Sequence, residues 1–382
     1  MKKIFYIDQQ SYSNLAIYDH SLLSAIAKET PDFQIEYWGN RKYEYMPLPE
    51  VINPHWIYRY SDCRNKILSL LSYIFSSILL LVNLLIRRPD VVHLQWVKIF
   101  QMDYLILWAA KKICKSHVVF TAHNIVPHNS GESAKKSYGK IYKNADTVIV
   151  HTETSLSDFT NMFPDYSHKA KVVPHGLLPN KFTQEEILAR ANEIRTELNL
   201  PEGTRVFSML GYQSYYKGTD IVCNAWNSSK TLTEGNFILL VAGRCAQDII
   251  PEGCAANVIV INRFISDLDF LGYLNMTDVL LLPYRAIDQS GLLLTAFESS
   301  IPVCVSNVGE LGKPLEDAKV GWMFDSLECQ DVRKMIETLA DNPQEIDQVK
   351  AAEEDWNKVR EMYGWTESAK LTKAIYNEEY NS

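Results

Sequence analysis

The sequence has cysteines but no paired cysteine pattern. Seven cysteines are scattered along 382 residues, and none shows the close spacing of a disulfide framework or a zinc site. Scattered cysteines are typical of proteins that stay in a reducing compartment. Their arrangement argues against a disulfide-stabilised secreted domain, and no acidic residue at ligand spacing accompanies the histidines. We therefore expect no metal site.

Several catalytic and binding motifs are also missing. The first apolar run is not followed by the GxGxxG pattern of dinucleotide-binding folds, and the chain has no GxxxxGK[ST] loop of the kind found in NTPases. It has no GxSxG turn, which disfavours hydrolases with a serine nucleophile. No basic stripe is interleaved with aromatic residues, so we expect no nucleic-acid partner.

The start of the chain lacks the pattern of a secretory leader. MKKIFYIDQQ contains one apolar run of strand length, without a longer apolar region or a small-residue cleavage site. Together with the cysteine pattern, this predicts a cytoplasmic protein. Internal repeats and low-complexity segments are absent as well.

The size and the charge distribution point to two different halves. A chain of 382 residues exceeds one ordinary core, so two domains are expected. Residues 1–180 hold 20 basic and 15 acidic side chains, whereas residues 181–382 hold 18 and 31. A basic first half suits contact with anionic lipid or an anionic acceptor, and simple drift in surface composition is the alternative.

One segment raises the question of a membrane. Ile67–Ile86 is 20 residues long without a charge, which is long enough to span a bilayer. Ser69, Ser72, Ser76 and Asn83 fall on one helical face, and the segment leads directly into the strand-like VVHLQW. We expect a buried helix of an α/β domain. A helix that also touches the membrane surface, at the inner face, and a spanning helix remain the alternatives.

Short runs rich in valine and isoleucine alternate with helix-length segments over the whole chain. Such alternation predicts the α/β class, with parallel sheets covered on both faces. A connection from Gly176 to about Gly203 separates two such series, so we expect two α/β units with a cleft between them. In open sheets of this kind, ligands bind beyond the carboxyl ends of the strands.

The strands of the second half end in residues suited to an anionic ligand. A glycine at the end of one strand, Gly211, allows close backbone approach, and Lys217 precedes a helix start. Backbone N–H groups of the helix that begins at Ser290 and Gly291 are suited to a diphosphate. Each strand end by itself is most often only a turn with a solvated charge. The other strand-end candidates are Arg244, Arg263, Phe264, Tyr284 and Arg285.

Histidines stand at strand ends in the first half. His123 and Asn124 directly follow a strand, and His93 and Trp96 end a neighbouring one. His123 is suited to binding a polar substrate or stabilising developing charge. For His93 and His151 we expect a hydrogen-bonded structural role.

In their order and spacing, several stretches make the sequence resemble the GT-B glycosyltransferases, and within them the retaining enzymes of glycosyltransferase family 4. The stretches, which lie between about residue 90 and residue 370, are DVVHLQW, FTAHNIVPH, KNADTVIVHT, VVPHG, LGYQSYYKG, NRFIS, LNMTDVLLLPYR, QSGLLLTAF, IPVCVSNVGEL and GWMF. The resemblance implies two Rossmann-like domains facing across a cleft, over residues 1–178 and 179–364. It also implies that a last helix, from about 365 to 382, crosses back to the N-terminal domain.

The resemblance also implies roles for individual residues. Lys217 would grip the donor diphosphate, and His123 would lie near the transferred sugar, which makes these two the catalytic candidates. Ser290 and Gly291 would hold the distal phosphate, and Arg263–Ile265 would lie against the base. The further donor-side candidates are Gly211, Arg244, Phe264, Ile265, Tyr284, Leu292 and Thr295, and the acceptor-side candidates are Tyr12, Asn14, Trp96 and Asn124.

The sequence departs from the family pattern at three places. No arginine lies shortly before Lys217, although Arg244 or Arg285 are candidates to compensate. The acceptor loop QQSYSN has no glycine. The second glutamate common in the phosphate loop would fall at Thr295 or Ala296, so Glu298 is not the aligned carboxylate. The Gln-Ser-Gly form resembles a subset common in surface-polysaccharide assembly.

The leading hypothesis is a retaining, metal-independent hexosyltransferase. It would use a UDP- or GDP-type sugar as substrate, need no further cofactor, and act on a saccharide or lipid-linked saccharide. A non-catalytic binder of nucleotide sugar or glycan is the alternative, because of the missing arginine and glutamate. Little in the sequence favours an epimerase or a phosphorylase, and nothing indicates an oligomeric state.

Overall fold

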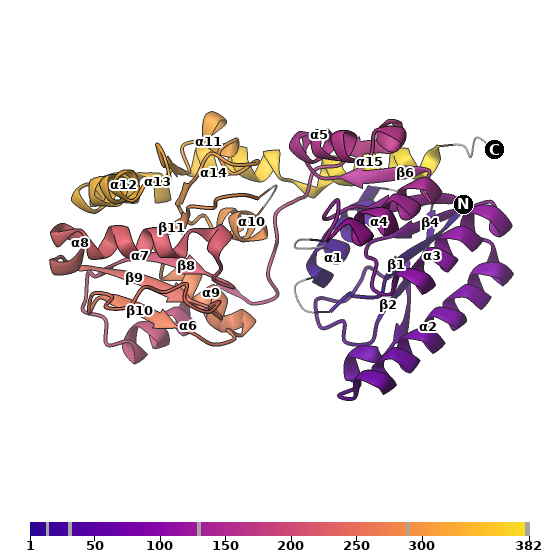
Figure 1. Ribbon diagram of the computed structural model, residues 1–382, viewed down its shortest axis with the longest axis horizontal. Coiled ribbons are helices and arrows are strands. Elements are labelled where there is room, and N and C mark those ends of the chain that lie inside the picture. Colours follow the sequence, from indigo (N-terminus) through magenta and orange to yellow (C-terminus); the bar gives the residue numbers. More distant parts are fainter. Residues whose placement is uncertain (13–14, 30–32, 128–130, 288–289, 379–382) are drawn as a thin grey trace. The chain divides into compact units, whose positions relative to one another are not determined.

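The computed structural model describes residues 1–382 except 13–14, 30–32, 128–130, 288–289 and 379–382. The chain forms two compact units, each of the α/β class (Figure 1). Unit 1 comprises Met1–Gly176 and Gly364–Ser382, and unit 2 comprises Leu177–Tyr363. The division falls within two residues of the boundaries expected from the sequence.

Unit 1 is built on a seven-stranded parallel sheet in the order β3-β2-β1-β4-β5-β6-β7. Its central strands are buried along their whole length, because helices cover both faces, and this explains their continuous apolar runs. The strands are β1 (Lys2–Asp8), β2 (Phe33–Asn40), β3 (Ile52–Tyr58), β4 (Val91–Leu94), β5 (His117–Thr121), β6 (Thr147–Val150) and β7 (Ala170–Val172).

The helices of unit 1 include the last helix of the chain. Helix α15 (Trp365–Asn377) packs on α1 (Leu15–Glu29), and its Ile375 and Tyr376 belong to the same buried cluster as Ile4 of β1. The expected return of the C-terminal helix to the first domain is thus confirmed. The other helices are α2 (Lys66–Arg87), α3 (Phe100–Ala109), α4 (Glu132–Asn144) and α5 (Glu153–Met162), with short turns η1 (Tyr60–Asp62), η2 (Ala110–Cys114) and η3 (Pro164–Lys169).

Unit 2 is built on a six-stranded parallel sheet in the order β10-β9-β8-β11-β12-β13. Its strands are β8 (Arg205–Leu210), β9 (Phe237–Ala242), β10 (Val258–Ile261), β11 (Val279–Leu282), β12 (Val303–Val305) and β13 (Gly321–Met323). Its helical elements are α6 (Gln184–Glu197), η4 (Tyr215–Lys217), α7 (Thr219–Asn227), α8 (Lys230–Glu234), α9 (Asp267–Asn275), α10 (Gly291–Glu298), α11 (Pro314–Asp317), α12 (Cys329–Asp341), α13 (Pro343–Lys350) and α14 (Glu353–Met362).

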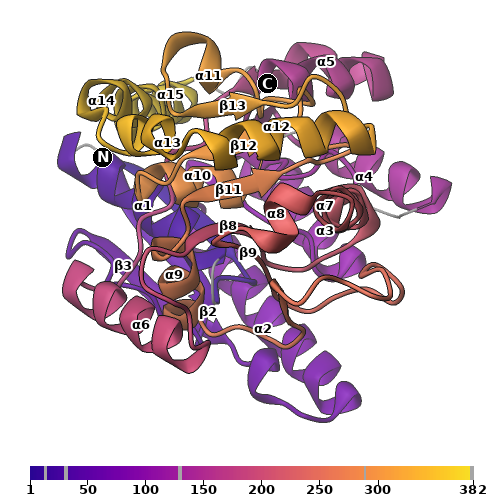
Figure 2. The same cartoon turned by 90° about the vertical axis from the view of Figure 1, so that its left-hand side faces the viewer.

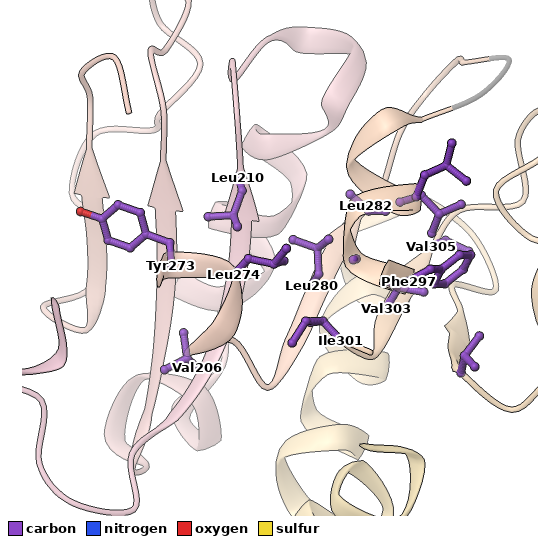
Figure 3. Close-up of a cluster of buried hydrophobic side chains, with 14 of the residues drawn as sticks. Val206, Leu210, Tyr273, Leu274, Leu280, Leu282, Phe297, Ile301, Val303 and Val305 are labelled. Carbon is purple, nitrogen blue, oxygen red and sulfur yellow. The ribbon is translucent and has the colours of Figure 1, made fainter. Parts of the chain in front are cut away.

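Helices cover both faces of the unit 2 sheet (Figure 2). A buried apolar cluster lies between the sheet and the helices on each face. Side chains of α7, α8 and α12 fill one cluster, and side chains of α6, α9, α10 and α14 fill the other. Figure 3 shows Phe297 of α10 lying against Val303 and Val305 of β12. This packing anchors α10 and thereby fixes where its N-terminal end lies.

Helix α2 differs from the buried helix that the sequence predicts. Asn65 caps it by accepting hydrogen bonds from the backbone N–H groups of Ile67 and Leu68. Only Tyr73, Ser76, Ser77, Leu80 and Leu84 are buried, because α2 touches the unit along one narrow face. Among the described residues it is the one helix that is long and apolar enough to cross a membrane.

A pair of buried carboxyl groups lies at the end of β1. Asp8 and Asp19 are fully buried and lie next to each other, and the hydroxyl groups of Tyr6 and Tyr37 donate to Asp19 at 2.8 and 2.6 Å. Burial raises the pKa of Asp8 well above its ordinary value and that of Asp19 to about 6. The folded protein therefore holds protons here that the unfolded chain releases above about pH 4.

This pair makes the stability of unit 1 depend on pH. The folded pKa values lie above the unfolded ones, so the contribution to stability is fully present below pH 4 and is lost as the pH rises through about 6. Between pH 5 and pH 8 the melting temperature of the parent protein should fall. We expect Asp8→Asn to make this fall smaller by about 2–4 °C, because a pKa shift of one unit corresponds to about 1.4 kcal/mol of stability. Differential scanning fluorimetry across this range measures the effect.

The matched control is Asp158→Asn, which removes an exposed carboxylate on α5. It should leave the pH dependence unchanged. An Asp8→Asn protein whose melting temperature falls between pH 5 and pH 8 as steeply as the parent's would show that the pair does not carry the extra proton.

Candidate functional site

Lys217 is a buried cation at the carboxyl end of β8. It ends the turn η4, and its side chain is only 9% exposed. Its Nζ donates to the carbonyl oxygen of Leu210 at 3.3 Å and lies 5.5 Å from the centre of the Tyr284 ring. Burial lowers the pKa of Lys217 to about 8. A carbonyl and a ring face compensate a buried ammonium only in part, so an anionic ligand would stabilise it.

The N-terminal end of α10 also contacts Tyr284. The Tyr284 side chain hydrogen-bonds with that of Ser290, whose Oγ caps α10 by accepting from the N–H of Leu293 at 3.3 Å. Gly291 is exposed at the first position of the helix. The first N–H groups of a helix have no partner within the helix and carry its positive dipole end. Tyr284 thus joins the two features that the sequence predicts for phosphate binding.

Two glycines let the backbone close around this point. Gly211 and Gly243 end β8 and β9 with φ angles of +85° and +141°, which L side chains rarely adopt. A Cβ on Gly243 would lie 1.9 Å from the carbonyl oxygen of Gly211. A Cβ on Gly211 would lie 3.3 Å from the Nζ of Lys217, so the glycine leaves the lysine amine uncovered on that side.

Arg285 has a structural role that rules it out as a replacement for the missing family arginine. Its guanidinium forms a two-point ion pair with Asp220 at 2.8 and 2.7 Å and lies 3.9 Å above the Tyr215 ring. It also donates to the backbone oxygen of Tyr215, and its N–H donates to that of Tyr216 at 2.7 Å. Arg285 therefore fixes the turn that carries Lys217.

The candidate that remains is Arg244. Its side chain is exposed, and its guanidinium lies 5.9 Å from the centre of the Phe264 ring. Within the described part of the chain it has no ion-pair partner, so its charge is available to a ligand at the end of β9.

The predicted base-binding loop presents one large side chain to solvent. Phe264 is 67% exposed, whereas Ile265 packs against the core of unit 2. Arg263 is held by Asp269 at 3.2 Å. An exposed ring beside two guanidinium groups is suited to stacking on a flat base.

The two remaining α10 candidates have different surroundings. Leu292 is partly buried against the core of unit 2. Thr295 Oγ1 donates back to the carbonyl oxygen of Gly291 at 2.9 Å, so its hydroxyl proton is already used within the helix. Thr295 can only accept from a ligand.

Glu298 lies at the far end of α10, near α14. It is partly buried, and burial raises its pKa against the opposing effect of Arg360 on α14. Arg360 in turn donates to the hydroxyl of Ser300 at 2.7 Å. These contacts give Glu298 a structural partner away from the first turn of α10.

In unit 1, His123 belongs to a network of buried rings. Its ring stacks on Trp96 with centres 4.4 Å apart and an angle of 9°, and Tyr18 meets it edge-on at 4.7 Å. His151 Nδ1 donates to the carbonyl oxygen of Val173 at 2.9 Å, and its Nε2 lies 3.2 Å from His123 Nδ1. His123 Nε2 lies 3.1 Å from the side-chain oxygen of Gln95, which can only accept, so Nε2 carries the proton of the neutral His123 ring and donates it to Gln95.

The network continues from His123 to the last helix of the chain. The Gln95 amide is 2.9 Å from His93 Nε2, and His93 Nδ1 is 2.7 Å from the hydroxyl of Tyr376 on α15. Burial lowers the pKa of His93 to about 3 and that of His151 to about 4, and burial with these histidine neighbours lowers the pKa of His123 well below 6.5. His123 is therefore a neutral ring held on both nitrogens by unit 1.

The other acceptor-side candidates are not brought together with His123 by any described contact. Tyr12 packs edge-on against Tyr60 at 6.4 Å, and Asn124 is partly exposed after His123. Asn14 lies outside the described residues. Of the acceptor-side set, the structure thus joins only Trp96 to His123.

Sequence reasoning missed Gln213. It is fully buried at the end of β8, where its Nε2 donates to the oxygen of Gly211 at 2.8 Å and its Oε1 accepts from Thr219 at 2.8 Å. It thereby links both ends of the Lys217 turn. A glutamine between Tyr212 and Ser214 carries no local signal for this role. Across the described residues, no group of three His, Cys, Asp or Glu side chains is placed to hold a metal ion.

The histidine network predicts that His123 does not titrate near neutral pH. NMR spectra with labelled histidine should show it neutral from pH 8 down to pH 5, because charging it would bury a cation among three further histidines. Trp96→Ala, which opens one face of the ring to water, should raise its pKa toward 6.5. Exposed His168 on η3 is an internal reference. A His123 midpoint near 6.5 in the unaltered protein would contradict this account.

Comparisons with known proteins agree with this arrangement. No family model matches the chain. A D-inositol 3-phosphate glycosyltransferase of Corynebacterium urealyticum is 23% identical over 308 residues, which cover 75% of this chain and 71% of that protein. The relationship is distant but extends over both units.

Solved structures with the same fold cover nearly the whole chain. Anabaena Alr3699/HepE, solved in complex with UDP and glucose, has a TM-score of 0.65 and 13% identity over 98% of this chain and 99% of its own. WaaG, a glycosyltransferase involved in lipopolysaccharide biosynthesis, has a TM-score of 0.66 and 13% identity over 98% and 100%. The family resemblance of the motifs is confirmed: the chain has the GT-B fold and is related to glycosyltransferases of the family 4 type.

Proposed function

We propose that the protein is a retaining, metal-independent glycosyltransferase. It transfers a hexose from a UDP- or GDP-type sugar to a saccharide or lipid-linked saccharide during assembly of a bacterial surface polysaccharide. The main observation behind this proposal is that Lys217 and Ser290, at the N-terminal end of α10, both contact Tyr284. The UDP complex of the HepE structure and the resemblance of the Gln-Ser-Gly loop support the donor and the pathway class.

In the proposed reaction the bond between the sugar C1 and the diphosphate oxygen breaks, a hydroxyl oxygen of the acceptor forms the new bond to C1, and the proton of that hydroxyl passes to the departing diphosphate. The departing diphosphate gains negative charge. Lys217 and the first N–H groups of α10 stabilise that charge from fixed positions, so no reorganisation is needed at the moment of bond breaking. Arg244 adds a second cation, and Phe264 stacks on the base. Retention of the anomeric configuration rests on the family resemblance.

His123 is assigned to the transferred sugar on the same resemblance. As a neutral ring stacked on Trp96, it would bind a sugar hydroxyl and would not donate a positive charge. Binding through a ring nitrogen requires exchange of its partner Gln95 or His151.

A non-catalytic nucleotide-sugar binder is the second candidate. It is favoured by the engagement of Arg285 with Asp220 and by the lack of an acidic residue at Thr295 and Ala296, where the family's second glutamate would fall. Both candidates predict binding, and only the first predicts transfer.

A donor screen separates the two. UDP- and GDP-sugars are first tested for a rise in melting temperature, because a ligand of the folded state stabilises it by mass action. Donors that bind are then incubated with saccharide and lipid-linked acceptors, and released nucleotide and product are measured. Transfer supports the enzyme, binding without transfer supports the binder, and the absence of any binding contradicts both.

We expect Lys217→Met to reduce kcat by about 10²–10³-fold, the loss typical when one charge-stabilising donor is removed. The fold should persist, because the variant removes a buried charge that pairs with none of the described carboxylates. In the parent protein, affinity for UDP by calorimetry should fall as the pH rises through about 8, where Lys217 loses its proton. In Lys217→Met the affinity should be lower and flat across this range.

The control for this variant is Lys334→Met, an exposed lysine on α12. It should leave both kcat and the pH dependence unchanged. A Lys217→Met protein with unaltered kcat would contradict the assignment.

We expect Glu298→Gln to leave the KM for the donor within about twofold of the parent, because Glu298 lies beside α14. Gly291→Val, at the exposed start of the same helix, should raise that KM by crowding the phosphate position. Steady-state kinetics measures both. If Glu298→Gln raises the donor KM tenfold or more, the prediction is contradicted and Glu298 does contact the ribose of the donor.

A further inference from the structure

Helix α2 presents an almost entirely apolar face to solvent. Nine of its large apolar side chains are exposed, and on a helical projection they cover an arc of about 180°. The exposed fractions reach 71% for Phe75 and 76% for Ile86. The nine are Ile67, Leu68, Leu70, Leu71, Phe75, Ile78, Leu79, Val82 and Ile86. So large a contiguous apolar surface marks an interaction site.

The face that α2 turns toward unit 1 is the more polar one. Ser76 Oγ donates to the oxygen of Ile57 at 2.7 Å, and Ser69 Oγ donates to that of Tyr60 at 3.0 Å. The hydroxyl of Tyr73 donates to buried Asp103 at 2.5 Å. The serine seam found in the sequence therefore holds the helix to its unit. The leucine-rich side faces outward, opposite to the usual arrangement on a water-soluble domain.

Elements next to α2 also expose large apolar side chains. Helix α3, which packs beside α2, exposes Leu105 and Trp108, and η2 exposes Ile113. Tryptophan is enriched where protein surfaces meet the membrane interface.

Basic side chains accompany this surface. Residues 59–115 contain nine lysines and arginines and three acidic residues, a net charge of +6. Arg87 and Lys111 are paired with Glu36 and Asp146. The seven others are exposed and, among the described residues, have no ion-pair partner: Arg59, Arg64, Lys66, Arg88, Lys98, Lys112 and Lys115.

We propose that the α2 face, defined as the nine exposed residues above with this basic rim, docks in the interface of an anionic phospholipid bilayer. The helix lies along the surface with its apolar side in the acyl boundary and its basic ends among the headgroups. A span is excluded because α2 joins β3 to β4, and both are strands of the one sheet. A second copy of the chain is disfavoured because it would bring an equal basic rim against this one.

Vesicle flotation tests this proposal without any nucleotide or acceptor, so it can fail independently of the proposed function. The full chain should float with vesicles of phosphatidylglycerol and phosphatidylcholine and much less with phosphatidylcholine alone. Added salt should weaken the binding, because it screens the basic rim. Phe75→Ser with Ile78→Ser should reduce the partition coefficient by at least about tenfold per residue removed.

Further variants test the contribution of the basic side chains and provide controls outside the α2 face. Arg64→Gln with Lys66→Gln should weaken binding to the anionic vesicles by about fivefold per charge. Leu188→Ser, an equally exposed leucine on α6 of unit 2, and Lys334→Gln should change nothing. All substituted positions are exposed, and circular dichroism checks that the fold is intact.

Two outcomes would overturn the proposal. One is the absence of binding to anionic vesicles, or binding that Phe75→Ser with Ile78→Ser leaves unchanged. The other is a stable dimer in solution that the same double variant dissociates, which would assign the α2 face to a second copy of the chain.

Discussion

The proposed donor site depends on one incompletely compensated charge, the ammonium of Lys217. It lies at the ends of β8 and β11 with a carbonyl oxygen and the face of Tyr284 as neighbours, and none of the described carboxylates pairs with it. A buried ammonium without a full set of partners is costly, which is why its pKa falls to about 8. A diphosphate would supply the missing partner. The surrounding features, from Gly211 to the Arg285–Asp220 ion pair, serve to keep this cation in place and accessible.

The electrostatics of unit 2 support the same view. Residues 177–363 carry 28 acidic and only 16 basic side chains, yet Lys217, Arg244 and Arg263 all lie beyond strand ends of the sheet. A cationic edge on an acidic domain is a local arrangement. It favours a small anionic ligand at that edge over a large polyanion, which the rest of the surface would repel.

The sequence predicted the parts that depend on local pattern. The alternation of strands and helices indicated two α/β units, and strand ends followed by a glycine, a lysine or a serine indicated Lys217, Ser290 and Gly291. It could not predict contacts between residues far apart in the chain. Arg285 and Asp220, which form an ion pair, are 65 residues apart in the sequence, and Tyr376 and His93, which are in hydrogen-bond contact, are 283 residues apart. For the same reason His123 could be located but not its state, since neutrality comes from the rings around it.

For helix α2, the sequence pattern led to a wrong prediction of burial. Its small polar residues fall on one face, as the sequence indicated, but the helix as a whole was expected to be buried, whereas its leucine-rich face is exposed. The serines form the inward face because the oxygens of Ile57 and Tyr60 need donors there. Which face a helix buries is decided by the surface that receives it, and this surface lies outside the helix sequence.

The central claim concerns the charge on Lys217, and its most direct test is the pKa of that side chain. NMR of lysine labelled at its ε position, assigned with Lys217→Arg, follows the titration in the free protein and in the presence of UDP. The account predicts a midpoint near 8 in the free protein and a rise of about two units with UDP, because the diphosphate stabilises the charged form. A midpoint near 10.4 that UDP does not move would contradict it.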